Sequence, residues 1–576
     1  MSFAMQAEIN LQVLPPVKVS ESAPPLTAPT TRTTLRLAEL VLLAVAAVFL
    51  VLHAIHLRAD FPNHSPWMDW AKYTDEGWYG DAAIRHFQRG AWYVPGDFNP
   101  AAALPVWPLL ESAVFHFTGV NIVAARSLTV GIFALILISA YLLVRRCQRI
   151  SGTQPGTQPG PSLAAPAAVL LLAVSPFCYV FSRMAILEPM LILLTLLSLL
   201  AASFVPEPGK ASTRLDRVRR AMPVVALGLL LPLMVLTKTT AIFLFPAIAW
   251  MLFARSGYRL WPALKAAAPA GVLAGFLWVA YYSIVVRPHF LEDYRYLFSA
   301  NGYTGITSQN AIEVLRDTFA DGMWLGRVLY PLALVATVIV LLIRPRLLRN
   351  PLLPALFLWI GGYLGFIAYH DNLQPRYFLV IAVPVTLLMV TVLESLWKKR
   401  DSLASFYSPG AMAFVAAVVV VAVTDAQQTA GYVRHPEYTF AHAAERIRDI
   451  VSSDHTHNPL VLSISGSDLS LMTGVPSICD DFGTMDLEER VNSYHPGWYV
   501  AWNQVDDDKM DALTPSYHLQ RVASFPAMDD PERNLLILYR LDPPQSPPAR
   551  RLRPRHIPQF LQTGFGQQAS PVQLQH

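Results

Sequence analysis

Two adjacent acidic residues, Asp75 and Glu76, are the first candidates for chemistry in this chain. They lie in the segment YTDEGWYGDAAIRHFQRGAW (73–92), directly after the first long apolar run. A carboxylate in such a place can take a proton from an attacking hydroxyl. The nearby tryptophans can stack on a sugar, but Trp also concentrates at the boundary between membrane and water, so they are equally interpreted as interfacial anchors. These tryptophans are Trp67, Trp70, Trp78 and Trp92.

Three basic residues and one acid interrupt or flank later apolar runs. A charge in or near the hydrocarbon costs roughly 2.5–3.5 kcal/mol on insertion scales. Each residue alone is interpreted as a cap that reaches to the interface. All four fall at the outer ends of different runs, however, and this coincidence favours a shared function. They are Arg183 and Glu188 in FSRMAILEPML (181–191), Lys238 in LMVLTKTTAIFLF (233–245) and Arg376 in QPRYFLVIAVP (374–384).

Converging Arg and Lys side chains indicate a phosphate, because Arg can hold it through two hydrogen bonds and Lys adds a point charge. A phosphate at the depth of the outer leaflet indicates a lipid headgroup. With a carboxylate nearby, this set predicts transfer of a group from a lipid phosphate to an acceptor hydroxyl, with the cations stabilising the departing phosphate. The sequence has no Gly-rich or Walker-type nucleotide loop, which fits a lipid-linked donor rather than a nucleotide sugar.

The composition indicates which elements must position these groups. Of 576 residues, 53% are hydrophobic and only 15% are charged, and the mean hydropathy is +0.37. Soluble proteins average about 25% charged residues, so this chain belongs among the polytopic membrane proteins. Cys147, Cys178 and Cys479 are expected in different compartments, which excludes a disulfide framework, and no Cys/His spacing is typical of a zinc site.

About eleven apolar runs approach the length of roughly 20 residues that a membrane-spanning helix needs. Clusters of Lys and Arg follow alternate runs and all fall on one side, and such clusters resist translocation. We therefore expect the N-terminus in the cytoplasm and everything after residue 425 outside. The predicted spans are 37–57, 120–144, 163–181, 187–204, 221–237, 239–254, 262–286, 325–343, 352–369, 377–396 and 409–425.

The predicted regions follow from this topology. Residues 1–36 and 546–576 are expected to be disordered tails. The membrane domain covers residues 37–425, and its first outer loop, residues 58–119, carries the acidic pair. Residues 426–545 are expected to form a small α/β domain outside the membrane.

Within this small domain, residues 458–474 have the pattern of a strand, a turn and a short helix, and residues 497–502 and 534–541 have the pattern of strands. The turn SGSDL (465–469) lacks the Gly-x-Ser-x-Gly arrangement of a nucleophile elbow. We interpret it as a strand-to-helix turn with a capping Ser or Asp.

The sequence resembles the integral-membrane glycosyltransferases of the GT-C fold, in the branch of the protein O-mannosyltransferases and lipid A aminoarabinose transferases, glycosyltransferase family 39. The likeness covers about residues 35 to 425 and implies an all-α polytopic membrane domain of about 11 transmembrane helices. The small α/β domain lies outside it. The residues that carry the likeness are Asp75, Glu76, Tyr79, Arg85, Gly90, Trp92 and Pro95, the segment RMAILE from Arg183 to Glu188, Thr237 with Lys238, and Pro375 to Phe378.

The resemblance implies roles for these residues. Asp75 corresponds to the catalytic base, and Glu76 corresponds to a residue that positions the sugar or the acceptor. Arg183 and Lys238 correspond to the main contacts of the lipid phosphate, and Arg376 is a secondary candidate. His370, with Asp371, either lines the cavity or binds a metal, and a structural role is the alternative for each. Asp81 and Arg85 lie four residues apart, which predicts a helix salt bridge. The expected substrate-binding residues are Glu76, Tyr79, Arg183, Glu188, Lys238, His370 and Arg376.

Together these features predict an inverting glycosyltransferase that uses a polyprenyl-phosphate-linked sugar donor at the outer face of a bacterial inner membrane. The expected acceptor is a lipid, glycan or protein hydroxyl, and nucleic acid is not an expected partner. No cofactor or metal residue is predicted, and a divalent cation is left open. The sugar is open too, because AAALPVWPLLE (101–111) lacks the Lys of the aminoarabinose branch. A secondary transporter or flippase would share the spans and charges but break no bond, and a degenerate scaffold is a third alternative.

Overall fold

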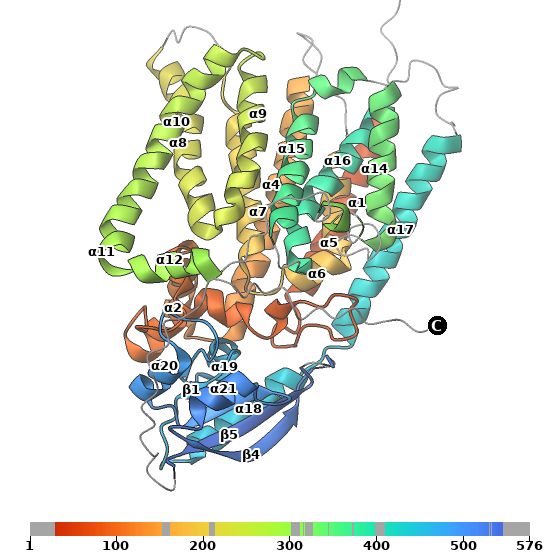
Figure 1. Cartoon of the computed structure of the whole chain (residues 1–576). Helices are drawn as coiled ribbons and strands as arrows, with labels where there is room; N and C mark the ends of the chain where they lie inside the picture. The colour runs from red at the N-terminus through yellow and green to blue at the C-terminus, as the bar shows by residue number, and fades with distance from the viewer. Residues whose placement is uncertain are drawn as a thin grey trace, which may run out of the picture.

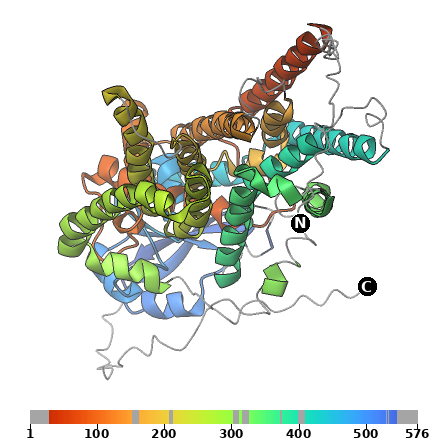
Figure 2. The same cartoon turned by 90° about the horizontal axis from the view of Figure 1, so that it is seen from above.

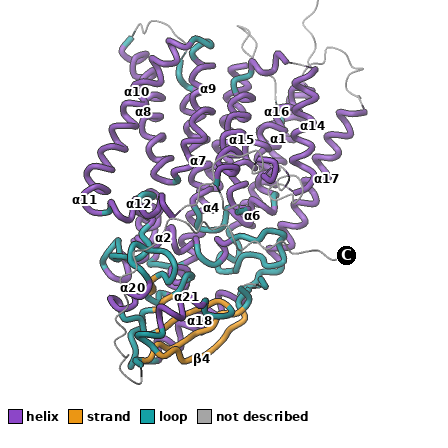
Figure 3. Tube along the Cα trace, viewed as in Figure 1, coloured by secondary structure: helices purple, strands orange, loops and turns teal. Residues whose placement is uncertain are grey.

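The computed structural model places the long apolar helices at one end of the molecule and a small sheet at the other (Figure 1). Residues 58–119, the predicted first outer loop, lie between them. The described strands all lie in the C-terminal part of the chain (Figure 3). The structure describes residues 29–151, 162–206, 213–300, 311–314, 316, 326–343, 345–370, 374–397, 409–528, 530–531 and 533–544. Most of the predicted N-terminal tail, all of the predicted C-terminal tail and Asp371 lie outside these residues.

Apolar helices occupy all the predicted spans. Among the described residues, six helices are long and apolar enough to cross a membrane: α1 (Pro29–His53), α4 (Ile122–Ser151), α8 (Arg214–Thr237), α10 (Leu260–Tyr281), α15 (Leu352–Tyr369) and α16 (Leu379–Trp397). Shorter or partly described apolar helices fill the others: α5 (Ala164–Val174), α7 (Leu187–Ser203), α9 (Phe245–Arg255), α14 (Gly326–Ile343) and α17 (Pro409–Arg434). The chain is therefore a multi-pass membrane protein with an all-α membrane domain.

Two breaks in the apolar helices have local causes. Helix α5 ends at Val174, and α6 (Pro176–Phe181) begins anew because Ser175 accepts a hydrogen bond of 3.2 Å from the backbone N–H of Cys178. Helix α8 ends at Thr237, because Lys238 adopts an extended conformation before the short helix η3 (Thr239–Leu244). The second break lies between two predicted spans and leaves Lys238 at a helix end.

The first outer loop folds into four short helices, η1 (Trp70–Lys72), α2 (Asp75–Arg89), η2 (Pro100–Ala102) and α3 (Val106–Thr118). Helix α2 begins with two acids, which the positive end of the helix dipole stabilises. It ends at Gly90, whose φ of 74° lies in the left-handed region that favours glycine. The loop that precedes α14 contains η4 (Tyr282–Val286), α11 (Arg287–His289) and α12 (Leu291–Ala300), and η5 (Pro345–Arg349) follows α14.

The C-terminal domain is a five-stranded mixed sheet with the strand order β2-β1-β3-β5-β4. Strand β1 pairs in parallel with β2 and β3, while β5 pairs antiparallel with β3 and β4. Side chains of the central strand alternate between two cores, with Trp498, Val500 and Trp502 in one and Tyr499 and Ala501 in the other. The strands are β1 (Val461–Leu462), β2 (Ser477–Ile478), β3 (Trp498–Trp502), β4 (His518–Pro526) and β5 (Leu535–Asp542).

Four helices accompany this sheet: α18 (Thr439–Ser453), α19 (Gly466–Thr473), α20 (Leu487–Tyr494) and α21 (Asp507–Leu513). Viewed from above, the domain lies behind the helices of the membrane domain (Figure 2). The C-terminal domain contacts the first outer loop through hydrogen bonds. Asp60 of the loop accepts from the backbone N–H groups of Phe440 and Ala441. The outer loop therefore forms the junction between the two parts.

Candidate active site

Asp75 is the first residue of α2 and is only 2% exposed. The hydroxyl of Thr74 donates a hydrogen bond of 2.9 Å to its Oδ1. Its Oδ2 lies 2.9 Å from Nη2 of Arg376, although the two groups are not aligned as a hydrogen bond. Asp75 thus faces a cation and keeps an oxygen that can accept a proton.

Arg376 lies in the short helix η6 (Pro375–Phe378), which opens the span of α16, and is 4% exposed. Its guanidinium also pairs with Asp69 of the outer loop, and its backbone N–H donates a hydrogen bond of 2.8 Å to the same carboxylate. Asp69 is itself the N-cap of η1, where it accepts from the backbone N–H of Ala71. Arg376 therefore lies between two carboxylates of one loop.

Lys238 reaches the same cluster from the break after α8. Its ammonium forms a buried ion pair with Glu188, at the start of α7, and lies 4.4 Å from the ring centre of Tyr377. Tyr377 is the neighbour of Arg376, whose guanidinium carbon lies 4.9 Å from the same ring centre. The tyrosine ring is thus shared by the two cations.

Tyr79 and His370 lie at the edge of this cluster. Tyr79 follows Asp75 by one helical turn, and its phenol interacts electrostatically with Asp75 and Arg376. The ring of His370 lies 5.6 Å from that of Tyr377. Burial lowers the pKa of His370 to about 4, and the charges of Lys238 and Arg376 act in the same direction, so the imidazole is neutral near pH 7.

The environment of Asp75 raises its pKa. Burial is the main cause, because a charged carboxylate loses its hydration. The charge of Arg376 opposes this effect and lowers the pKa, while the nearby negative charge of Asp69 raises it. A carboxylate whose pKa is raised but which is held by a cation is suited to accept a proton from a hydroxyl.

Glu76 points to the opposite side, toward α4. Its carboxylate accepts from Arg126 at 2.5 to 3.0 Å, and the backbone N–H of Ala185 donates a further hydrogen bond of 2.8 Å. Arg126 also binds the backbone carbonyl groups of Leu57 and Ala59. Glu76 therefore fixes the start of α2 to the membrane helices, next to the turn that precedes α7.

Arg183 makes its contacts with groups other than Asp75. Its guanidinium donates to the carbonyl groups of Ile55 and His56, pairs with the hydroxyl of Tyr179 and stacks on that ring at 4.5 Å. It lines a small cleft of about 20 Å³ together with Asp60 and other residues. That volume holds about one water molecule, too little for a phosphate group. Lys238 and Arg376 share the ring of Tyr377, whereas the role of Arg183 as a phosphate contact stays a prediction.

The helix salt bridge predicted between Asp81 and Arg85 is confirmed, with an N–O distance of 2.6 Å. The same guanidinium also binds Asp97 at 2.6 Å and the carbonyl of Phe98 at 3.1 Å. Burial raises the pKa of Asp81 to about 6, against the charge of Arg85. This network holds the loop in shape and lies away from the cations that face Asp75.

Sequence reasoning missed several carboxylates near α2, among them Asp69 and Asp468. Asp69 precedes a three-residue helix, which leaves no periodic signal. Asp468 lies in the turn SGSDL, where a capping Ser or Asp was expected, and this expectation is wrong. Ser465, the N-cap of α19, makes no capping bond, because its hydroxyl accepts from the indole N–H of Trp502 instead. Asp468 accepts from Gly77 of α2.

Among the described residues, no group of three or more His, Cys, Asp or Glu side chains is arranged to hold a metal ion. The three cysteines are free and buried. Asp371, the suggested partner of His370, lies outside the described residues.

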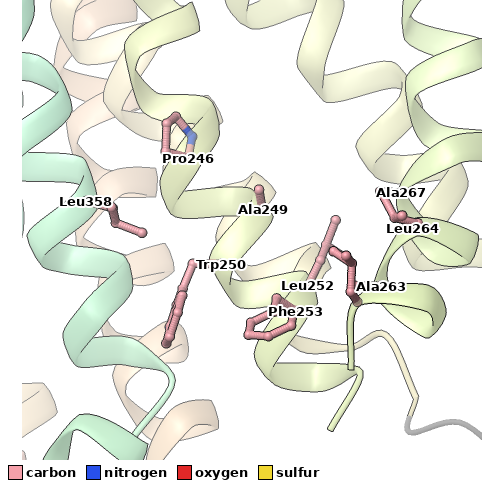
Figure 4. Close-up of a pocket in the computed structure, with 10 residues that line it drawn as sticks. Pro246, Ala249, Trp250, Leu252, Phe253, Ala263, Leu264, Ala267 and Leu358 are labelled. Carbon is pink, nitrogen blue, oxygen red and sulfur yellow. The ribbon is translucent and has the colours of Figure 1, made fainter. Parts of the chain in front are cut away.

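A second cavity, of about 290 Å³, opens between α9, α10 and α15 (Figure 4). It has apolar walls, with Pro246, Ala249 and Phe253 contributed by α9, Leu264 by α10 and Leu358 by α15. Such walls offer nothing to a phosphate but suit a hydrocarbon chain. The short helix η3 follows Lys238 and continues directly into α9, so one helical stretch runs from the polar cluster to the wall of the cavity.

The geometry can be compared with known proteins. No protein-family model matches the sequence, and no curated protein matches it. ArnT from Cupriavidus metallidurans, in the apo state, is 17% identical and matches with a TM-score of 0.55, over 87% of this chain and 97% of ArnT. The same protein bound to undecaprenyl phosphate also matches with a TM-score of 0.55, over 89% of this chain and 98% of that chain.

The match to ArnT shows that the chain has the GT-C fold. The Archaeoglobus fulgidus oligosaccharyltransferase, in a complex with Zn and sulfate, matches at 13% identity and a TM-score of 0.46, over 86% of this chain and 72% of that chain. The GT-C fold confirms the predicted fold class, with its membrane helices and a small C-terminal sheet. Membership of glycosyltransferase family 39 stays a prediction.

Proposed function

We propose that this protein is an inverting glycosyltransferase that moves a sugar from a polyprenyl-phosphate donor to an acceptor hydroxyl. The observation that carries the proposal is the contact of Asp75 with Arg376, beside Lys238, in a cluster built from separate parts of the chain. A base and two cations within one cluster are the groups that such a transfer needs. The GT-C fold and the lipid bound to ArnT support the choice of donor.

In the proposed reaction, the acceptor hydroxyl gives its proton to Asp75 as its oxygen forms a bond to the anomeric carbon. The bond between that carbon and the phosphate oxygen breaks at the same time, and the electron pair leaves with the phosphate. Lys238 and Arg376 stabilise the negative charge that develops on the departing phosphate. A single displacement of this kind inverts the configuration of the anomeric carbon.

The carboxylates around the cations have a role in this scheme. Glu188 and Asp69 hold Lys238 and Arg376 in place without the donor, since an unpaired buried charge is costly. A bound phosphate then shares these cations, and Lys has further N–H donors to offer. Tyr79 and His370, at the edge of the cluster, line the proposed site on the side of the sugar or the acceptor. Glu76 acts indirectly, because its hydrogen bonds fix the start of α2.

The lipid part of the donor has a place in the apolar cavity between α9, α10 and α15. Its walls are apolar, and α9 leads from η3, next to Lys238, to the cavity. A prenyl chain anchored by its phosphate at Lys238 can follow this helix. Burial of the chain would add binding free energy in proportion to the apolar area removed from water.

The proposed location is a bacterial inner membrane, with the N-terminus in the cytoplasm and the site and the C-terminal domain on the outer, periplasmic side. The Lys/Arg clusters of the alternate loops support this orientation. The acceptor, whether lipid, glycan or protein, reaches the site from the same side.

The proposal is tested with purified full-length protein, an envelope extract that supplies acceptor hydroxyls, and a panel of undecaprenyl-phosphate donors that carry different hexoses and pentoses. We expect one donor to release free undecaprenyl phosphate, and the released or transferred sugar to be detected by mass spectrometry. A transporter or flippase would move the donor between the leaflets of a vesicle without release. Movement without release for every donor of the panel would refute the proposal.

A further inference from the structure

The C-terminal domain meets α2 at the carboxyl ends of its parallel strands. The turn after β1 provides the carbonyl of Ile464, which accepts a hydrogen bond of 3.0 Å from the indole N–H of Trp78. After the neighbouring strand β2, the backbone N–H of Cys479 donates to Asp97 of the outer loop. In α/β sheets the carboxyl ends of parallel strands are the usual place for a ligand. Here the outer loop of the same chain occupies that place.

The closest part of this contact is at the first turn of α2. The backbone N–H of Gly77 donates a hydrogen bond of 2.5 Å to Oδ1 of Asp468. A side chain at Gly77 is excluded, because a Cβ atom there would lie 2.1 Å from the backbone carbon of Ser467. Gly77 therefore allows the two backbones to approach until the carboxylate reaches the helix.

This hydrogen bond gives the backbone N–H of Gly77, in the first turn of α2, a partner that the helix itself cannot provide. The first N–H groups of a helix have no partner within the helix, and a side chain of the N-cap residue normally accepts from one of them. Thr74, the N-cap of α2, makes no such bond; its single hydroxyl hydrogen is shared between the carbonyl of Trp70 and Oδ1 of Asp75. Asp468, from a separate domain, takes over the missing capping role.

We propose that Asp468 is a positioning residue for Asp75, and that the C-terminal domain thereby holds the active site in its working geometry. The inference rests on the proposed role of Asp75 as the base. Asp75 and Gly77 belong to the same helical turn, so the clamp on Gly77 fixes the direction in which the Asp75 carboxylate leaves the helix. Displacement of a reacting group by about 1 Å can lower a rate 100-fold.

The surroundings of Asp468 indicate which substitution preserves its hydrogen bond with Gly77. The residue is 1% exposed, and its Oδ2 has no hydrogen-bond partner among the described residues. Burial raises the pKa of Asp468 well above its usual value, and the charge of Glu76 acts in the same direction. Asn has nearly the same size as Asp and keeps a side-chain oxygen that can accept from the N–H of Gly77.

The test compares Asp468→Ala, Asp468→Asn and the matched control Asp480→Ala in the full-length protein. Asp480 is another buried aspartate of the same domain, and its ion pair is with Lys509, within that domain. Hydrogen exchange of the peptide that covers residues 74–80 is the first measurement, since it needs no substrate. We expect faster exchange in Asp468→Ala, and exchange at the rate of the unaltered protein in Asp468→Asn and Asp480→Ala.

The second measurement is turnover of the undecaprenyl-phosphate sugar that the unaltered protein releases. We expect Asp468→Ala to lower kcat about 10- to 100-fold with little change in KM, and Asn to restore kcat. Unchanged exchange and kcat in Asp468→Ala, or equal losses in Asp480→Ala, would overturn the inference. Asp75→Asn separates the two proposals: if that variant stays fully active, the assignment of the base fails, whereas the exchange data still test the clamp.

Discussion

Nη2 of Arg376 lies 2.9 Å from Oδ2 of Asp75, which joins a late membrane span to the first outer loop. The two side chains affect each other's proton affinity. Burial raises the pKa of Asp75, and the positive charge of Arg376 lowers it. The contact thus helps to set the pH above which Asp75 is ionised and able to act as a base.

We predict that Asp75→Asn lowers the rate of donor turnover by about 100- to 10,000-fold, the usual contribution of a general base. Asn has nearly the same size and keeps the hydrogen bond from Thr74, so binding of undecaprenyl phosphate should change little. Turnover and lipid binding are measured on the same preparations. An active Asn variant would exclude Asp75 as the base.

The pH dependence of the unaltered protein gives a second prediction. A base acts only when ionised, and the pKa of Asp75 is raised, so kcat/KM should fall as the pH drops through a value above the usual range of an aspartate. Arg376→Ala removes the charge that lowers this pKa. The acidic limb should then move to higher pH. A limb that stays in place would show that another group titrates.

The membrane helices could be predicted from the sequence, because an apolar run of sufficient length has few alternatives to a span. The breaks were harder. The α8–α9 break at Lys238 coincides with a charge, whereas Ser175 and Pro176 divide one predicted span into α5 and α6 inside an apolar stretch. In the C-terminal domain, strands β1, β3 and β5 are runs of mostly buried apolar residues, which can be recognised in the sequence. The edge strand β4 is mostly exposed and gives a much weaker signal.

The site could be predicted only in part. Lys238 and Arg376 lie near Asp75, as motif order and topology suggested, because their loops lie at the same end of the bundle. The position of Arg183 depends on where its long side chain finds carbonyl groups, which sequence does not reveal. Asp468 meets α2 through contacts between distant segments, and no local pattern encodes such a contact.

The ion pair of Lys238 with Glu188 leads to a prediction about stability. Lys238→Met alone leaves Glu188 buried without its partner, which should cost about 3–5 kcal/mol of unfolding free energy. Met and Leu are apolar and similar in size to the Lys and Glu side chains that they replace. The double variant Lys238→Met with Glu188→Leu should therefore recover most of this loss. Thermal unfolding in detergent gives the comparison.

Donor binding should respond differently. If Lys238 contacts the phosphate, the double variant stays as weak in binding undecaprenyl phosphate as Lys238→Met. Recovery of binding together with stability would mean that Lys238 supports the fold and not the donor.

Arg183 offers a control of the opposite kind. Its guanidinium satisfies two backbone carbonyl groups, so Arg183→Ala should lower the free energy of unfolding by about 1–3 kcal/mol. Because its contacts lie away from Asp75, KM for the donor should stay nearly unchanged. A large rise in KM with unchanged thermal stability would restore Arg183 as a phosphate contact.

The apolar cavity predicts a dependence on the length of the lipid. Ala249→Trp places a bulky ring in the wall between α9 and α10. We expect KM to rise about tenfold for an undecaprenyl-phosphate donor, equivalent to about 1.4 kcal/mol, and to stay the same for a donor with a short prenyl chain. An equal effect on both donors would place the lipid elsewhere.

The bond between Asp468 and Gly77 has a consequence for how the protein is made. Asp468 is synthesised after every apolar helix, so a ribosome completes the membrane part while the first turn of α2 still lacks its partner. Nascent chains halted before this point, however well inserted, would be unable to turn over donor. Full enzymatic activity would then begin only once the final folded portion has docked.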